Sequence, residues 1–323
     1  MVSALAGIKG RFAPTPSGNM HAGNALCYLL AWLSARSQGG SVVLRVEDTD
    51  LARMSPAATE QTFSDLQWLG LDWDEGPAPG ERSGPYFQSC RTEIYDAYFN
   101  DLRERGAVYP CFCSRKDVRL AAAPHEEDRA AVYPGTCREL DAAQVAALEK
   151  KRAPAWRLRL EDETLSFSDA LRGDFSCEIL REYGDFPIRR ADGVYCYQFA
   201  AALDDALMGV SEVVRSRDLL SSTPWQVYIQ RLFGFAPPRF VHIPLLLDEE
   251  GRRMAKRDFS LSLRQIRRHY APEEVLGALA FLAGLQESPA PKTAAELLPD
   301  FSWERLRRED IVMPRSLFAR CAE

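Results

Sequence analysis

The sequence of 323 residues lacks any apolar run that approaches the ~20 residues needed to span a membrane. Its opening segment, MVSALAGIK, lacks the charged-then-apolar order that marks a signal peptide. A convincing repeat and a low-complexity segment are also missing. These absences argue against a membrane-spanning helix and a repeat architecture, and we expect a cytoplasmic protein.

The sequence also lacks an excess of positive charge, because 46 Asp and Glu outnumber 40 Lys and Arg and give a formal net charge of −6. This balance argues against a nonspecific coat on nucleic acid, and we expect no DNA partner. It permits an RNA enzyme with a local basic face. A hydrophobic content of 46% is ordinary for a globular protein, and the length suffices for one large α/β domain with insertions.

Eight cysteines in a cytosolic chain of this length do not predict a disulfide framework. Three of them, Cys111, Cys113 and Cys137, form a cluster that is typical of a zinc site. A tetrahedral Zn²⁺ with three thiolates requires a fourth ligand. General ligand preference favours His125, whereas a spacing of four residues before Cys137 favours Tyr133. We expect one structural zinc and leave the choice of fourth ligand open.

The stretch RFAPTPSGNMHAGN, residues 11–24, separates a predicted strand over 8–13 from a predicted helix over 24–37. The leucines of this segment recur at helical spacing and fall on one face, which supports the predicted helix. The glycine-bearing loop directs backbone N–H groups and the positive end of the helix to one point, which favours a bound phosphate. A further strand predicted over 42–47 completes a βαβ unit of a parallel sheet.

The rest of the pattern also mixes helices and strands. We expect helices over 56–70, 94–105 and 140–152, short strands over 155–185, a strand–helix–strand unit over 186–220 and a buried strand over 239–248. After about residue 260 the pattern is helical, with a joint rich in Pro and Ala at 288–295.

Two charged clusters follow predicted strands, at the edge where ligands bind in open α/β sheets. Glu47, Asp48 and Asp50 end the second strand, and one of these carboxylates can hold a substrate ammonium or hydroxyl group. At least one of them is expected to be a solvated turn residue, with Asp50 capping the next helix. The basic run RRMAKR, residues 252–257, follows a glycine turn and can clamp a polyphosphate, although a basic turn alone is a weak signal.

Taken in order, these motifs resemble those of the class I aminoacyl-tRNA synthetases. PTPSGNMHAGN is similar to the first signature of that class, and RRMAKR is similar to a divergent second signature. The opening RFAPTPSG, the strand end RVEDTD and the stretch VYCYQFAAALDDALMGVSEVVRSRDLLSSTPWQ resemble the glutamyl branch. Only 66 residues follow Arg257, fewer than a stem-contact region and an anticodon-binding domain need. With the cysteine cluster, this resembles the glutamyl-queuosine tRNA(Asp) synthetase family.

The resemblance implies a Rossmann-like parallel-sheet nucleotide-binding domain in two halves, 1–108 and 186–260. A zinc-bearing insertion over 109–185 would lie between the halves, and a helical region would follow over 261–323. The implied activity uses ATP, with Mg²⁺, to activate glutamate. It then transfers the glutamate to the queuosine base in the anticodon of tRNA(Asp). We expect a monomer.

Particular residues carry the implied roles. The glutamate site would comprise Arg11, Phe12, Ala13, Pro14, Thr15, Glu47, Tyr197 and Arg215, in which the two arginines meet the two carboxylates and Glu47 meets the ammonium group. The ATP site would comprise His21, Gly23, Asn24 and Lys256, of which His21 and Lys256 are catalytic. The zinc ligands would be Cys111, Cys113, Tyr133 and Cys137.

The sequence departs from the two signatures in places. Asn24 replaces the final histidine of the first signature, and Ala255 and Arg257 replace serines of the second, which removes a hydroxyl contact to ATP.

Two alternative functions are an ordinary glutamyl-tRNA synthetase that charges a tRNA 3′ end and a non-catalytic, zinc-bearing RNA-binding module. The missing anticodon-binding domain argues against the first. The presence of the whole set of site residues in one chain argues against the second.

Overall fold

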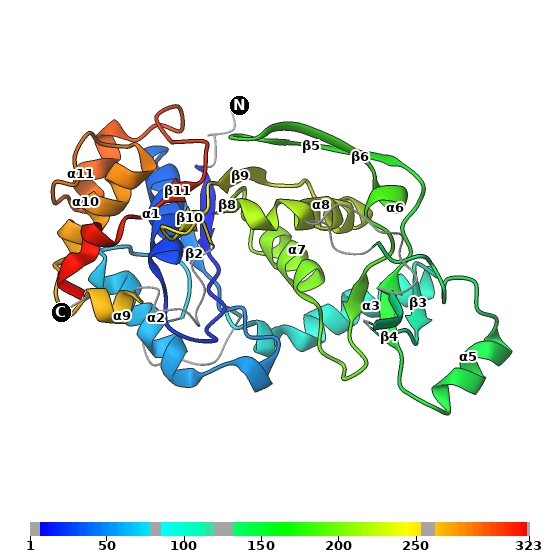
Figure 1. The fold of residues 1–323 in the computed structure, drawn as a ribbon. Helices are drawn as coiled ribbons and strands as arrows, with labels where there is room; N and C mark the ends of the chain where they lie inside the picture. The colour runs from blue at the N-terminus through cyan, green and yellow to red at the C-terminus, as the bar shows by residue number, and fades with distance from the viewer. Residues whose placement is uncertain (1–6, 78–84, 115, 119–131, 253–261, 322–323) are drawn as a thin grey trace.

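The computed structural model describes residues 7–77, 85–114, 116–118, 132–252 and 262–321, and it has mixed α/β structure (Figure 1). Within these residues the α-helices are α1 (Ala22–Ser37), α2 (Pro56–Trp68), α3 (Thr92–Glu104), α5 (Ala142–Glu149), α6 (Ile179–Glu182), α7 (Tyr197–Leu207), α8 (Thr223–Leu232), α9 (Leu263–Ile266), α10 (Pro272–Ala283) and α11 (Ala294–Leu297). The strands are β1 (Lys9–Phe12), β2 (Ser41–Leu44), β3 (Val108–Cys111), β4 (Ala155–Leu158), β5 (Thr164–Asp169), β6 (Gly173–Glu178), β7 (Pro187–Arg189), β8 (Glu212–Ser216), β9 (Arg239–Ile243), β10 (Leu246–Leu247) and β11 (Ile311–Val312). Short 3₁₀ helices are η1 (Leu51–Arg53), η2 (Gln88–Arg91), η3 (Arg217–Ser222), η4 (Leu298–Asp300) and η5 (Arg315–Cys321).

The βαβ unit at the start of the chain forms as the sequence predicts. β1 and β2 pair in parallel, with Phe12 beside Leu44, and α1 connects them. The helix begins at Ala22, earlier than the predicted residue 24, because the side chain of His21 caps it by accepting the N–H of Asn24 at 3.4 Å. The second strand ends at Leu44, short of the predicted residue 47.

The strand–helix–strand unit predicted over 186–220 is present as β7, α7 and β8. α8 then leads into β9, which pairs in parallel with β8 and, at its other edge, with β5. β8 lies beside β1, where the N–H of Ser211 donates to the carbonyl oxygen of Lys9 at 2.9 Å. A mostly parallel layer of the expected Rossmann-like kind therefore brings the carboxyl ends of β1, β8 and β9 together.

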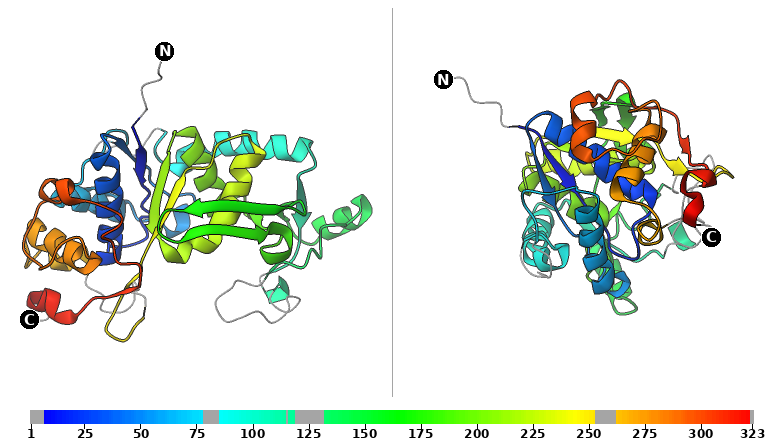
Figure 2. Two further views of the ribbon diagram at one scale, coloured as in Figure 1. Left: turned by 90° about the horizontal axis from the view of Figure 1, so that it is seen from above. Right: turned by 90° about the vertical axis from the view of Figure 1, so that its left-hand side faces the viewer.

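A separate antiparallel sheet is formed by β3, β4 and β7. It carries the cysteine cluster, and α5 extends from this end of the molecule, far from the C-terminal helices (Figures 1 and 2). The hairpin of β5 and β6 falls within the range 109–185 that the sequence assigned to an insertion. In the structure this hairpin extends the sheet of β8 and β9.

Two expectations about the later part of the chain are wrong. The run 239–248 is not one strand, because Pro244 lacks an N–H for a strand ladder and separates β9 from β10. β10 pairs instead in parallel with β11, with Leu246 beside Ile311. The region after residue 260 is therefore not helical throughout.

The helices predicted over 56–70, 94–105 and 140–152 are present as α2, α3 and the shorter α5. α2 begins at Pro56 after Ser55, whose side chain accepts the N–H of Ala58, and it buries Phe63 and Leu66. Among the described helices, none combines the length and the apolar character that crossing a membrane requires.

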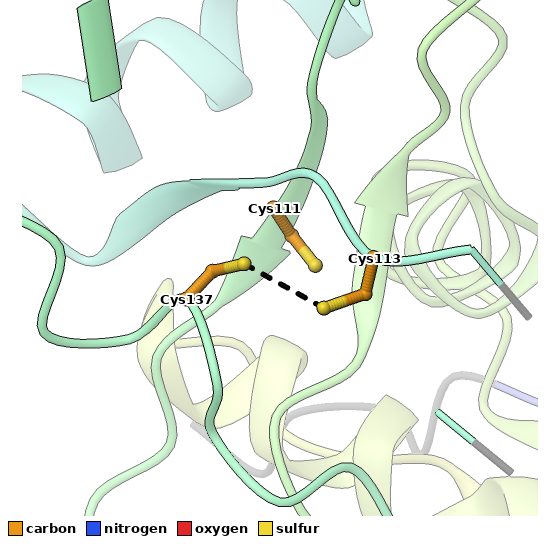
Figure 3. A group of neighbouring side chains, drawn as sticks. All are labelled: Cys111, Cys113 and Cys137. Carbon is orange, nitrogen blue, oxygen red and sulfur yellow. Dashed lines mark hydrogen bonds between the residues drawn. The ribbon is translucent and has the colours of Figure 1, made fainter. Parts of the chain in front are cut away.

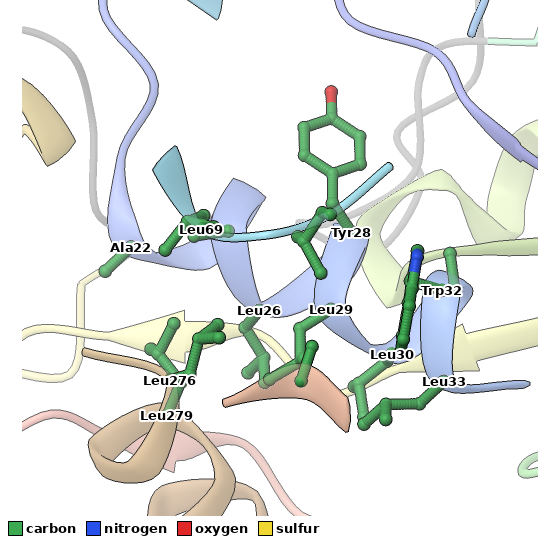
Figure 4. Packing of buried hydrophobic residues seen from close by; sticks show 14 of the residues in the cluster. Ala22, Leu26, Tyr28, Leu29, Leu30, Trp32, Leu33, Leu69, Leu276 and Leu279 are labelled. Carbon is green, nitrogen blue, oxygen red and sulfur yellow. The ribbon is translucent and has the colours of Figure 1, made fainter. Parts of the chain in front are cut away.

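The largest hydrophobic core forms around α1. Leu26 and Leu29 point from α1 toward Leu276 and Leu279 of α10, whereas Tyr28 points from another side of the helix (Figure 4). The C-terminal helices thus bury one face of α1, while its start remains beside the carboxyl ends of the parallel strands. This packing fixes the helix that carries the candidate phosphate site.

Candidate active site

A cavity of about 410 Å³ opens at the carboxyl ends of β1, β8 and β9. Of the residues predicted to bind glutamate or ATP, those that line it are Arg11, Ala13, Pro14, Thr15, His21, Gly23, Asn24, Glu47, Tyr197 and Arg215. Phe12 does not line it, because its side chain is fully buried and packs edge-on against Tyr28 at 5.3 Å between ring centres. Lys256 lies outside the described residues. The folded chain therefore brings segments far apart in the sequence to one cavity.

Arg215 enters this cavity from the end of β8, and its side chain is only 3% exposed. Its guanidinium group donates only to neutral partners, namely His242 Nε2 at 2.9 Å, Thr223 Oγ1 at 2.9 Å, Gln226 Oε1 at 2.6 Å and the Tyr197 hydroxyl at 3.4 Å. Among the described residues, no carboxylate lies within ion-pair distance of it. Burial lowers the pKa of Arg215, but a guanidinium stays protonated in proteins. The cavity therefore contains a buried positive charge that an anionic ligand would compensate.

Arg11 is the second arginine of the cavity and is 6% exposed. Its Nη1 donates to the carbonyl oxygen of Val214 at 3.2 Å, and its Nε lies 3.4 Å from Asp205 Oδ1. Its charge, unlike that of Arg215, thus has a carboxylate nearby. The two arginines give the cavity two cationic groups on neighbouring strands, β1 and β8.

Glu47 contacts the cavity from the chain that follows β2 and is 7% exposed. Its Oε1 accepts from Nη2 of Arg45 at 3.1 Å, and the same Nη2 lies 2.8 Å from Asp205 Oδ1. Burial raises the pKa of Glu47, while the guanidinium groups of Arg45 and Arg11 oppose that rise. A ligand ammonium group beside Glu47 would further favour its ionised form.

The other two carboxylates of this turn have different partners. Asp48 accepts from the backbone N–H of Ser89 at 2.8 Å and from the Ser89 hydroxyl at 2.7 Å. Asp50 stands at the start of η1 but makes no side-chain cap, and it pairs instead with Arg190 at 2.6 Å. Of the three, only Glu47 lines the cavity.

The start of α1, where the sequence predicts a phosphate site, lines the cavity. His21 and Asn24 cap each other, because Asn24 Oδ1 also accepts the backbone N–H of His21 at 3.4 Å. A side chain at Gly23 would come within 3.2 Å of the His21 ring, so glycine leaves room for that ring at the cavity wall. Ser262 pairs with His21 in an isolated antiparallel bridge. Ser262, which follows the second signature in the sequence, therefore lies beside His21 of the first signature.

The predicted metal cluster is assembled away from the cavity, at β3. The sulfur atoms of Cys111, Cys113 and Cys137 lie within 4.8 Å of one another and point together (Figure 3). The hydroxyl of Tyr133 lies 3.5 Å from the Cys111 sulfur and 3.9 Å from the Cys113 sulfur. It also accepts the N–H of Cys137 at 2.8 Å. The three sulfur atoms could hold a metal ion, whereas His125, the alternative to Tyr133 as fourth ligand, lies outside the described residues.

A positive group stands beside the cysteine cluster. Arg157 of β4 donates from Nε to the Cys111 sulfur at 3.2 Å and stacks on the Tyr133 ring at 3.7 Å. Burial raises the pKa of the Cys111 thiol, but the charge of Arg157 and the hydrogen bonds with Tyr133, Arg157 and the Cys113 backbone together outweigh burial, and the pKa lies below its usual value. A thiolate, the form that binds metals, is thus favoured at Cys111.

Sequence reasoning missed the residues that support the cavity from behind. Arg45 is fully buried and links Glu47 to Asp205, while His242 connects Arg215 to Asp169. The single arginine in the otherwise apolar run VVLRV, residues 42–46, is a sequence signal that could have identified Arg45. His242 gave no comparable signal, because its role depends on the pairing of β9 with β8.

Comparison with known families and proteins gives consistent matches. Residues 7–298 match the family described as the catalytic domain of class I tRNA synthetases for E and Q. The glutamyl-Q tRNA(Asp) synthetase of Nitratidesulfovibrio vulgaris is 46% identical over 316 residues, which cover 97% of this chain and 98% of that protein. The protein of the same name from Symbiobacterium thermophilum is 46% identical over 96% of this chain and 97% of its own length. A solved glutamate tRNA ligase of Elizabethkingia meningosepticum, in complex with its amino acid, has a TM-score of 0.81 and 26% identity, and covers 98% of this chain and 68% of that one.

The buried histidine behind the cavity predicts how stability depends on pH. Burial lowers the pKa of His242 from the usual 6.5 to about 4, although its bond to Asp169 opposes the shift. Between these values the unfolded chain binds a proton that the native state does not. The contribution of His242 to the free energy of unfolding is therefore complete above pH 6.5 and is lost as the pH falls toward 4, by at most about 3 kcal/mol.

Urea unfolding of the wild type and of His242→Gln at about pH 7 and about pH 5 measures this contribution. Glutamine does not titrate in this range, so we expect the wild type to lose more stability than the variant. The exposed His269 is present in both proteins and cancels in the comparison. Equal losses in the two proteins would show that His242 is protonated in the native state.

Proposed function

We infer that this chain, which belongs to the glutamyl-Q tRNA(Asp) synthetases within the class I tRNA synthetases for glutamate and glutamine, attaches glutamate to the queuosine of tRNA(Asp). The observation that carries this inference is 46% identity through 97% of the chain and 98% of the relative. The charges that line the cavity support it, because glutamate carries two carboxylates and one ammonium group.

In the proposed glutamate site, Arg215 and Arg11 each meet one carboxylate and Glu47 meets the ammonium group. Support comes from the lining of one cavity by all three side chains and from the neutral partners of Arg215. A bidentate contact between a guanidinium and a carboxylate is a strong and directional pairing. Tyr197, whose hydroxyl contacts Arg215 at 3.4 Å, would close the side of the site, and the backbone of residues 11–15 would form its floor.

We propose that ATP binds at the start of α1, where His21, Gly23 and Asn24 line the cavity. Backbone N–H groups and the positive end of a helix favour phosphate there, and Mg²⁺ would accompany the nucleotide. Lys256, which follows β10 in the sequence, is proposed to stabilise the charge that develops on the α-phosphate. An oxygen of the glutamate α-carboxylate would attack the α-phosphorus of ATP, and pyrophosphate would leave.

The second half of the proposed reaction transfers glutamate from the adenylate to RNA. A cyclopentene hydroxyl of queuosine would attack the acyl carbon, AMP would leave, and the proton of the hydroxyl would pass to solvent. Because AMP is a good leaving group, positioning supplies much of the remaining acceleration. The proposed partners of the chain, ATP and tRNA, favour a reaction in the cytoplasm.

We propose that the cysteine cluster binds one structural zinc ion with Cys111, Cys113, Cys137 and Tyr133 as ligands. Zinc–sulfur bonds of about 2.3 Å in a tetrahedron place two sulfur atoms about 3.8 Å apart. The sulfur atoms of Cys113 and Cys137 lie 3.6 Å apart, which fits that geometry. Bound zinc would crosslink the end of β3 to the turn at 133–137.

The transfer step gives a direct test of the function. Labelled glutamate should appear on tRNA(Asp) that carries queuosine and should be absent from the same tRNA with guanosine at that position. Removal of the 3′-terminal nucleotide with its ribose should leave the labelling intact, because the acceptor lies in the anticodon loop. If labelling required that ribose and ignored queuosine, the chain would be an ordinary glutamyl-tRNA synthetase.

The metal proposal has its own test. Protein purified without chelators should contain one zinc per chain, and Cys113→Ser should release it and lower the melting temperature, because structural zinc contributes to folding. Cys90→Ser is the matched control, since Cys90 is exposed and lies outside the cluster. Tyr133→Phe should weaken zinc retention against a chelator, whereas His125→Ala should not. Wild-type protein without zinc would rule out the proposal.

A further inference from the structure

A chain of three buried side chains lies behind the candidate glutamate site. Asp169 Oδ2 is 2.6 Å from Nδ1 of His242, and Nε2 of His242 accepts from Nε of Arg215 at 2.9 Å. Their exposed fractions are 4%, 0% and 3%. The three residues come from the adjacent strands β5, β9 and β8, which lie in one sheet. Only Arg215 lines the cavity.

Asp169 fixes which nitrogen of His242 carries the proton. Its Oδ2 also accepts the backbone N–H of His242 at 3.0 Å, and its Oδ1 accepts the N–H groups of Leu171 and Arg172 at 2.9 Å each. An ionised carboxylate only accepts hydrogen bonds, so Nδ1 of the neutral ring must be the donor. Nε2 then has a free electron pair, which faces the N–H of Arg215. The alternative tautomer would place two N–H groups against each other.

The neutral histidine meets two requirements at once. A carboxylate in its place would pair with Arg215 and compete with a ligand carboxylate. An apolar group in its place would leave a buried N–H of the guanidinium without a partner. His242 satisfies that N–H and leaves the positive charge uncompensated. With Gln226 and Thr223 at the other two nitrogens, it also fixes the plane of the guanidinium.

We propose that His242, held by Asp169 in one neutral tautomer, is the positioning residue that orients Arg215 for a carboxylate of glutamate. This inference rests on the proposed role of Arg215 in binding glutamate. His242 itself does not line the cavity and acts through Arg215. The burial of His242, which lowers its pKa to about 4, keeps the ring neutral at physiological pH and supports the assignment.

The test is glutamate-dependent exchange of pyrophosphate into ATP by the full chain. We expect His242→Leu to raise the KM for glutamate by about tenfold or more, which corresponds to ~1.4 kcal/mol, with the KM for ATP changed by less than about twofold. His242→Gln supplies an amide oxygen as acceptor and should stay within about threefold of the wild type. His269→Leu, at an exposed position, is the matched control and should leave both KM values unchanged.

Asp169→Asn keeps the shape of the carboxylate and covers the case in which His242→Leu fails to fold. Because an amide can donate as well as accept, it no longer enforces the tautomer, and we expect the KM for glutamate to rise with the KM for ATP unchanged. An unchanged KM for glutamate in His242→Leu or in Asp169→Asn would overturn the inference. An equal loss in His242→Gln and His242→Leu would also overturn it. Absence of exchange in the wild type would instead contradict the proposed function.

Discussion

The structure depends on one unusual arrangement, a buried arginine charge that no carboxylate of the described chain neutralises. A charge removed from water is costly unless it is paired, so Arg215 is suited to a ligand that brings a negative group. Histidine, threonine and glutamine side chains hold the guanidinium without cancelling its charge. The sheet makes this possible, because β9 places His242 directly beside Arg215 of β8.

Arg45 is a second buried arginine, and its charge is treated in the opposite way. It is fully buried, but it lies 3.1 Å from Glu47 and 2.8 Å from Asp205, so its charge is compensated within the protein. Asp205 also lies 3.4 Å from Arg11. This second network holds Glu47 at the cavity wall with a carboxylate available to an ammonium group. The two networks together match a substrate with charges of both signs.

The sequence identified local features that depend on short spacing. The loop before α1, the strand ends and the cysteine cluster could be recognised because their residues lie close together in the chain. The division of 239–248 into two strands was missed, although Pro244 was visible, because the partner strand β11 lies far along the chain. The roles of Asp205 and His242 could not be predicted either. They depend on which strands become neighbours, and periodicity does not specify that order.

The role of the buried Arg215 charge in binding substrate is tested most directly by the dependence of ATP–pyrophosphate exchange on glutamate and on glutamine in Arg215→Ala. We expect a rise of about tenfold or more in the KM for glutamate, ~1.4 kcal/mol, and a smaller preference for glutamate over glutamine. Arg239→Ala removes an arginine that is exposed and paired with Glu212, and it should change neither value. An unchanged KM for glutamate in Arg215→Ala would contradict the assignment of the buried charge to the substrate carboxylate.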